Sequence, residues 1–224
     1  MNVLMTIGII STKKYHSSRC NSILETWGKE LNNLFFITDA WEKRDNRFLK
    51  VTSKSDYKHA YIKTIEAIKR FVLFEEQTDW YLICDDDTYI NYNNLISFIA
   101  GKDPNYPILY GQVENTWPSD PSLYYCLGGA GYVISRRALE RLYIEILEQK
   151  NFRQYCTDFN DVIIGQFCRN KKIKSIHCNL FHGQKPNHSD YKYQNLEDIK
   201  NLKKQISFHY LNIEEFKELH NKLI

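Results

Sequence analysis

Runs of apolar residues alternate with mixed segments along the first half of the chain, and they predict strands and helices in turn. Residues 2–10 and 34–39 are short apolar runs typical of strands, and the second run ends in an acid. Residues 19–30 between them are expected to form a helix that ends near Gly28. This alternation favours a Rossmann-like α/β sheet.

The next helix is predicted by an apolar face whose residues are spaced by four, three and four positions: Tyr61, Ile65, Ile68 and Val72. Asp56 is expected to cap its start. A β-prone run at 80–84 then leads into three consecutive carboxylates at 85–87. A strand that ends in acids places them at the carboxyl edge of a sheet, where open α/β folds bind ligands.

The second half of the chain has shorter and more mixed signals. Strands are expected at 108–113, 132–134, 173–181 and 206–211, and helices at 95–100, 158–167 and 213–223. Ser135 is expected to cap a further helix, whose apolar residues are Leu139, Leu142, Tyr143 and Ile146. The chain of 224 residues has no internal repeat or low-complexity linker, so we expect one domain.

Composition narrows the class of protein. With 43% hydrophobic and 14% aromatic residues, the chain is expected to fold rather than to stay disordered. A net charge of +3 is too small to indicate a nucleic-acid partner. No apolar run approaches the roughly 18 residues that a membrane helix needs. We therefore expect a soluble chain, cytoplasmic if it is the full native chain and secretory if a targeting segment was removed.

The six cysteines support no zinc ribbon, because the chain contains no Cys-x-x-Cys motif. Cys156 and Cys168 bracket a short segment and could pair. The other cysteines are expected to be buried free thiols.

The acidic cluster is the first candidate for chemistry. Asp85 and Asp87 present two carboxylates from one turn, and these can share a divalent cation that itself carries a diphosphate. A solvated acidic loop is the alternative. A calcium-binding EF-hand does not fit, because Ile90 and Ile96 stand where that loop needs Gly and Glu.

A histidine is the second candidate ligand. One imidazole among oxygen ligands favours Mn²⁺ over Mg²⁺ or Ca²⁺. His182 is placed first because it is predicted to lie at the end of a strand, and His188 and His209 remain open.

Two further features have open interpretations. The Gly-Gly-Ala-Gly segment at 128–131 precedes a strand and does not fit a dinucleotide fingerprint. It is either a bend that needs positive φ or a backbone that approaches a sugar closely. Asp161 lies at a predicted helix start, where acids are favourable for structural reasons alone.

Taken in order, these segments resemble one family. The matching stretches span nearly the whole chain and lie at 25–29, 36–39, 63–64, 79–89, 128–135, 161–165, 181–182 and 207–210. They resemble the fringe-like inverting glycosyltransferases of glycosyltransferase family 31, and most of all the core 1 β-1,3-galactosyltransferase (T-synthase) group.

The resemblance implies a single catalytic domain over residues 1–224 with the GT-A fold. Its Rossmann-like nucleotide-binding half, with a central mixed sheet, would span about 1–100, and its acceptor-binding half about 101–224. The donor would be a UDP-sugar, with UDP-galactose favoured, and the acceptor a glycan or glycopeptide. A fringe-type UDP-N-acetylglucosamine transferase, a non-catalytic glycan-binding or chaperone relative, and a sugar-nucleotide hydrolase are the alternatives.

The resemblance also implies roles for single residues. Asp87 and His182 would bind Mn²⁺ or Mg²⁺, with His188 a possible substitute, and Asp161 would be the catalytic base. Donor contacts would come from five residues, Asp39, Lys63, Asp85, Asp86 and Gly129, of which Asp85 and Asp86 could bind the metal instead.

Three other features bear on the resemblance to this family. The loop at 12–19 is expected to meet the nucleotide. Asn160 departs from the family, whose members carry another acid there. Cys156 and Cys168 fall where relatives carry a cysteine pair, which favours an oxidising compartment.

Overall fold

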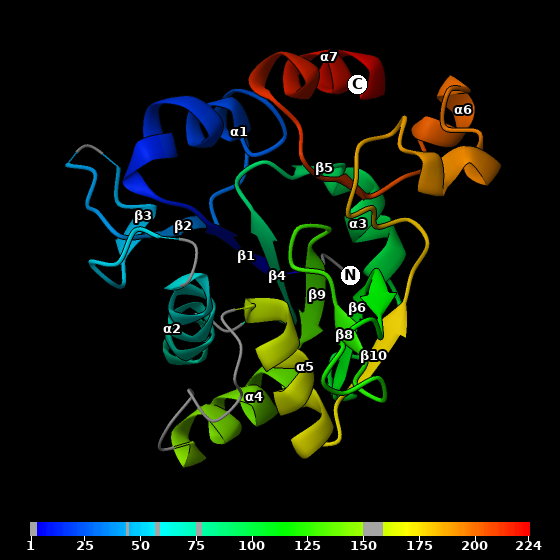
Figure 1. The fold of residues 1–224 in the computed structure, drawn as a ribbon. Coiled ribbons are helices and arrows are strands. Elements are labelled where there is room, and N and C mark those ends of the chain that lie inside the picture. The colour runs from blue at the N-terminus through cyan, green and yellow to red at the C-terminus, as the bar shows by residue number, and fades with distance from the viewer. Residues whose placement is uncertain (1–3, 44, 57–58, 75–77, 150–158) are drawn as a thin grey trace.

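The computed structural model describes residues 4–43, 45–56, 59–74, 78–149 and 159–224. Its centre is a seven-stranded sheet in the order β10-β6-β9-β4-β1-β2-β3 (Figure 1). The strands are β1 (Met5–Ile10), β2 (Leu34–Thr38), β3 (Phe48–Lys50), β4 (Trp80–Asp85), β6 (Ile108–Gly111), β9 (Tyr132–Ser135) and β10 (Lys174–His177). Strand β9 is antiparallel to both neighbours and the other pairs are parallel, so the sheet is mixed, as predicted.

Helices cover both faces of this sheet (Figure 1). One face carries α2 (Ala60–Leu73), α4 (Arg136–Glu148) and α5 (Asn160–Asn170). The other carries α1 (Asn21–Glu25), α3 (Tyr92–Ile99) and α7 (Ile213–Leu223). Shorter segments are the 3-10 turns η1 (Lys13–Tyr15) and η5 (Ser189–Gln194), the π-helical η2 (His16–Cys20) and α6 (Ile199–Leu202).

Side chains of the central strands alternate between two hydrophobic cores. In β1, Met5, Ile7 and Ile9 pack toward α1, α3 and α7, whereas Ile10 packs toward α2, α4 and α5. All six residues of β1 are buried, as are the first five of β4. A strand covered on both faces needs apolar residues at every position, and this is why these segments appear as continuous apolar runs.

The strand order reverses at β1, which lies between β2 and β4. Parallel pairing sets Ile10 opposite Asp85, so both strands end at the same edge of the sheet. Ser11 and the carboxylates that follow Asp85 therefore leave the sheet side by side. This edge is the switch point at which open α/β sheets bind their ligands.

Two small antiparallel ribbons extend the fold at this edge and beside it. One joins β5 (Tyr89–Ile90) to β11 (Ser207–Phe208), and the other joins β7 (Val113–Glu114) to β8 (Tyr125–Cys126). The first ribbon carries the chain that follows β11 back to the acids, where the backbone N–H of Leu211 donates to the carbonyl of Asp87 at 3.3 Å.

Several predicted element ends are wrong. The helix expected over 19–30 ends at Glu25, because the carbonyl of Ile23 accepts from both Thr26 N and Gly28 N and closes a turn. Asp56 does not cap α2. His59 occupies the N-cap position, and its Nδ1 lies 2.5 Å from the carboxylate of Asp56.

Other predictions are confirmed. Ser135 caps α4, with its hydroxyl accepting from Ala138 N at 3.1 Å, and α7 has the predicted bounds. The strand predicted over 173–181 is shorter, because β10 ends at His177 and the chain then turns, with Phe181 N donating to the carbonyl of Cys178.

The cysteines within the described residues are buried free thiols: Cys20, Cys84, Cys126, Cys168 and Cys178. Cys156, the possible partner of Cys168, lies outside those residues. Across the same part of the chain, no helix has both the length and the apolar character needed to cross a bilayer.

Candidate functional site

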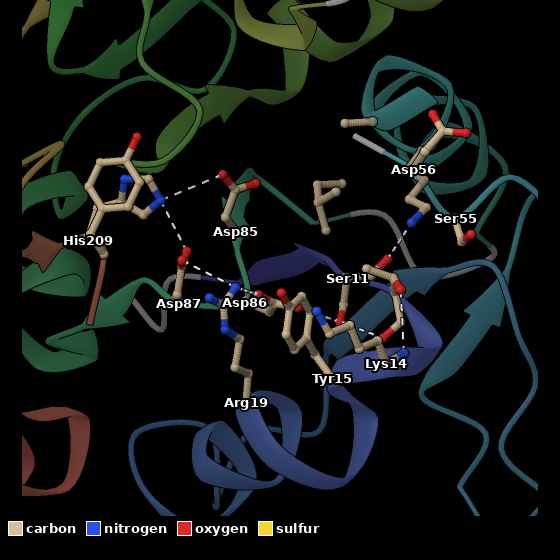
Figure 2. A pocket seen from close by; sticks show the side chains of 15 residues that line it. Ser11, Lys14, Tyr15, Arg19, Ser55, Asp56, Asp85, Asp86, Asp87 and His209 are labelled. Carbon is tan, nitrogen blue, oxygen red and sulfur yellow. Dashed lines mark hydrogen bonds and ion pairs between the residues drawn. The ribbon is translucent and has the colours of Figure 1, made fainter. Parts of the chain in front are cut away.

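A cavity of about 420 Å³ lies at the switch point of the sheet. Its lining comes from the chain after β1, from the start of α2, from the acids after β4 and from the chain after β11 (Figure 2). Four segments far apart in the sequence thus meet in one hollow. The loop at 12–19, which was expected to meet the nucleotide, contributes Thr12, Lys14, Tyr15 and Arg19 to the lining.

Two of the three acids form a group with His209. Its Nε2 lies 3.0 Å from Oδ1 of Asp87 and 3.8 Å from Oδ2 of Asp85. Figure 2 shows the imidazole edge pointing at both carboxylates. One ligand atom from each residue lies within 4.8 Å of the others, a spacing that a single metal ion can bridge.

The imidazole of His209 is held from its other side. Its Nδ1 lies 3.3 Å from the carbonyl oxygen of Gly183, to which it can donate. Metal-binding histidines usually donate their second ring N–H to such a carbonyl, which leaves the opposite nitrogen free for the metal. The next residue, Tyr210, has φ +60, a left-handed conformation that is unusual for a tyrosine and turns the chain immediately after His209.

The pKa values of this group reflect burial and mutual charge. Burial raises the pKa of Asp85, and the carboxylate of Asp87 adds to the effect. Burial acts in the same direction on Asp87, but the hydrogen bond from His209 and the charges of His209 and Arg19 outweigh it and lower its pKa. Burial lowers the pKa of His209, but the hydrogen bond to Asp87 and the negative charges of Asp87 and Asp85 together outweigh it, so the pKa is raised.

The middle acid, Asp86, faces away from His209. It is buried, and it accepts hydrogen bonds from the Ser11 hydroxyl at 2.6 Å and from Arg19 at 2.8 Å. Arg19 also lies 3.2 Å from Asp87 and packs over the ring of Tyr15 at 4.1 Å. Burial raises the pKa of Asp86, although both hydrogen bonds oppose the shift.

Lys63 places a buried ammonium at the cavity wall. Its Nζ donates to the carbonyl of Ser11 at 2.6 Å and lies 3.5 Å from Oδ1 of Asp39. Burial lowers the pKa of Lys63 although the charge of Asp39 opposes the shift. Asp39 is thus brought to the site through Lys63, and it also accepts from the backbone N–H of Lys13 at 3.1 Å.

Asp161 contacts the glycine turn at 128–131. At the start of α5, its Oδ2 accepts from Gly128 N at 3.3 Å. The next residue of that turn, Gly129, accepts from the hydroxyl of Thr88 at 2.7 Å. Burial raises the pKa of Asp161, and its charge in turn raises the pKa of Asp85.

His182, the histidine placed first from the sequence, lies in the core instead. Its side chain is 1% exposed, its ring stacks on Phe208 at 4.8 Å, and Nε2 lies 2.9 Å from Oε1 of Gln205. His188 is half exposed and pairs with Asp190. Among the described residues, His209 is the histidine that meets the carboxylates, and it was only an open alternative in the sequence.

A profile of the family described as Fringe-like matches residues 3–222. A human β-1,3-glucosyltransferase is 27% identical over 80% of this chain and 35% of its own length. A Xenopus laevis β-1,3-N-acetylglucosaminyltransferase, radical fringe, is 24% identical over 79% of this chain and 58% of its length. A Xenopus laevis glycoprotein-N-acetylgalactosamine 3-β-galactosyltransferase 1 is 30% identical over 70% of this chain and 40% of its length. The chain thus spans about a third to three fifths of these relatives.

The fold is also found in solved structures. The galactosyltransferase LgtC, in complex with donor and acceptor sugar analogs, matches with a TM-score of 0.55 at 14% identity, covering 98% of this chain and 96% of that chain. The predicted α/β fold of the GT-A type is therefore confirmed.

Proposed function

The chain belongs to the Fringe-like family, and from that premise we propose that it is a metal-dependent, inverting β-1,3-glycosyltransferase that uses a UDP-sugar. The observation that carries this proposal is the convergence of Asp85, Asp87 and His209 at the rim of the switch-point cavity. Two carboxylates and one imidazole suit a divalent cation that binds a diphosphate.

The cation would be held by Asp85, Asp87 and Nε2 of His209, and the mixed oxygen and nitrogen set favours Mn²⁺, with Mg²⁺ as the second choice. When bound, it would neutralise charge on the departing diphosphate. Asp85, which was expected to bind either the metal or the donor, would thus belong to the metal group, and His209 would take the role expected for His182.

The donor would occupy the cavity beside this group. Lys63 and Arg19 bring positive charge to its wall, and such charge suits a diphosphate. Asp86 fixes Arg19 and the start of the 12–19 loop, and Asp39 fixes Lys63. Both acids would thus act on the donor through these neighbours.

Asp161 would take the proton from the attacking hydroxyl of the acceptor. A general base works best when its pKa lies near the working pH, and burial raises the pKa of this carboxyl in that direction. Gly128 donates to one of its oxygens and keeps the carboxylate oriented. Attack on the anomeric carbon from the face opposite the departing UDP gives inversion, so an α-linked donor yields a β-linked product.

UDP-galactose remains the favoured donor and a glycan or glycopeptide the favoured acceptor. The relatives are named for glucose, N-acetylglucosamine and galactose transfer, so all three UDP-sugars belong in the same screen. A fringe-type UDP-N-acetylglucosamine transferase is the second candidate, supported by fringe relatives such as the Xenopus laevis radical fringe protein.

The test is UDP release from each donor with Mn²⁺, with Mg²⁺ and with EDTA, in the presence and absence of a panel of β-1,3 acceptors. We expect release that needs the metal and rises with one acceptor, and a β-1,3-linked product by mass spectrometry and NMR. Release that no acceptor stimulates would indicate a hydrolase. No metal-dependent release from any donor, with intact UDP binding, would indicate a non-catalytic relative.

A further inference from the structure

The turn at 128–131 leaves a space that one side chain fills. If Gly129 carried a Cβ, that atom would fall against the imidazole of His209, with Nε2 only 2.6 Å away and two further ring atoms closer still. At the neighbouring Gly128, the nearest atom to such a Cβ would be Oδ1 of Asn160 at 3.4 Å, an ordinary contact. The two glycines therefore face different constraints.

Backbone conformation does not explain the glycine at 129. Positive φ in this turn occurs at Gly131, with φ +75, and not at Gly129. Gly131 is needed because few other residues adopt that conformation. Gly129 is needed for space, because another group lies where its side chain would be.

Neither His209 nor Gly129 can move away from the other easily, because hydrogen bonds hold both. His209 is 7% exposed, its Nδ1 faces Gly183 O at 3.3 Å, and its backbone N–H donates to the carbonyl of Gln184 at 3.3 Å. Gly129 is anchored by its carbonyl, which accepts from Thr88 at 2.7 Å. Thr88 directly follows Asp87, so the turn is fastened to the same loop that supplies the carboxylates.

We propose that Gly129 is a positioning residue for His209: the missing side chain keeps open the space in which the imidazole reaches Asp85 and Asp87. This rests on the proposed function, in which that imidazole is a metal ligand. A side chain at Gly129 would push Nε2 away from the carboxylates, so metal affinity depends on glycine at this position.

The same turn also reaches Asp161 through Gly128 N at 3.3 Å. One four-residue turn thus contacts both the proposed base and the proposed metal ligand.

The experiment measures Mn²⁺ binding to the full chain by electron paramagnetic resonance titration, without donor or acceptor. The variants are G129A, H209A, the double variant G129A/H209A, and G128A as the matched control. We expect G129A to weaken Mn²⁺ binding by about 10–100-fold, the range found when residues that orient a ligand are changed. G128A should stay within about threefold of the wild type.

The double variant isolates the cause. If Gly129 acts only through His209, G129A/H209A binds Mn²⁺ no more weakly than H209A alone. If G129A folds poorly, the double variant recovers solubility and a cooperative thermal transition, because the clashing ring is gone.

Three outcomes overturn the inference. One is wild-type Mn²⁺ affinity in G129A, the second is an additive loss in the double variant, and the third is misfolding of G129A that H209A does not relieve. Failure of the proposed function has a different signature, which is no Mn²⁺ binding by the wild type or binding unaffected by H209A.

Discussion

The assignment of His182 to the core and of His209 to the carboxylates can be tested by measuring how the free energy of unfolding depends on pH. Its Nε2 is bonded to Gln205, and within the described residues its buried Nδ1 has no hydrogen-bond partner. The ring packs face to face with Phe208 and edge-on against Tyr191. A second proton would therefore place a charge at an atom that has neither water nor an acceptor, which folded proteins avoid. We consider the variant His182→Gln, which can still donate to Gln205 but cannot titrate.

The magnitude follows from the pKa of His182. Burial lowers it from its ordinary value of 6.5 to about 4 in the folded protein. Between these pH values the unfolded chain binds a proton at this ring that the folded chain does not. Stability is thus fully present above pH 6.5 and falls as the pH drops toward 4. At about 1.4 kcal/mol per pH unit, the loss is about 3 kcal/mol.

The assay is urea unfolding of wild type and His182→Gln at intervals from pH 7.5 to 4. Other titrating groups are common to both proteins, so their contributions cancel in the difference. We expect the free energy of unfolding of the wild type to fall by about 3 kcal/mol relative to the variant over this range. Parallel curves would refute a buried neutral His182.

The Mn²⁺ affinity of two variants tests the same assignment of the two histidines. His182→Gln should keep wild-type Mn²⁺ affinity, whereas His209→Ala should lose it. An equal loss in both variants would return His182 to the metal site and contradict the geometry, in which it lies in the core beside Phe208.

Two further changes test the base and the packing of its helix. Asp161→Asn should lower the rate of transfer, measured by single-turnover kinetics, by about 10²–10⁴-fold. Binding of UDP and Mn²⁺, measured by calorimetry, should stay unchanged. An unchanged rate would show that Asp161 is not the base. Gly165→Ala should destabilise the fold by about 1–3 kcal/mol in urea unfolding, because its Cβ would lie 2.5 Å from Cβ of Tyr125. An unchanged free energy of unfolding would mean that α5 can shift against β8 without cost.

The central elements could be predicted from the sequence because burial leaves a direct pattern. Strands β1 and β4 are covered on both faces and appear as apolar runs, and α2 and α4 each have one apolar stripe. The boundary of α1 could not be predicted, because it depends on how the carbonyl of Ile23 is shared by Thr26 and Gly28. Periodicity carries no information about such a turn.

The candidate site was predictable where its residues follow strands. Asp85 to Asp87 lie at the cavity, as the position of their strand implied, and Lys63, which was expected near the donor from the family resemblance, also lines it. The choice of histidine was not predictable, because it depends on the two-residue pairing of β11 with β5, which sets Phe208 opposite Tyr89. A ladder this short has no periodic signature. His182 was favoured because the strand before it was expected to be longer than it is, and because the family resemblance implied a metal ligand at this position.

The role of the glycine turn could likewise be predicted only in part from the sequence. Gly131 has the positive φ that the interpretation as a bend predicted. The group that approaches Gly129 in this structure is the side chain of His209, and only the tertiary structure places it there.

Three adjacent carboxylates can lie together at one strand end because different neighbours compensate the negative charge of each. Asp86 contacts Ser11 and Arg19, and Asp87 contacts Arg19 and His209. Within the part of the chain that the structure describes, the one ion pair of Asp85 is the more distant contact with His209. His209 binds Asp87 through Nε2, the same atom that a cation would use. A proton on Nε2 and a divalent cation therefore compete for one position, and metal binding must release that proton. Burial raises the pKa of Asp85, so the charged form of this carboxylate would be stabilised most by an added positive charge. The carboxylate that is least compensated among the three acids would thus be the one best placed to bind the proposed cation.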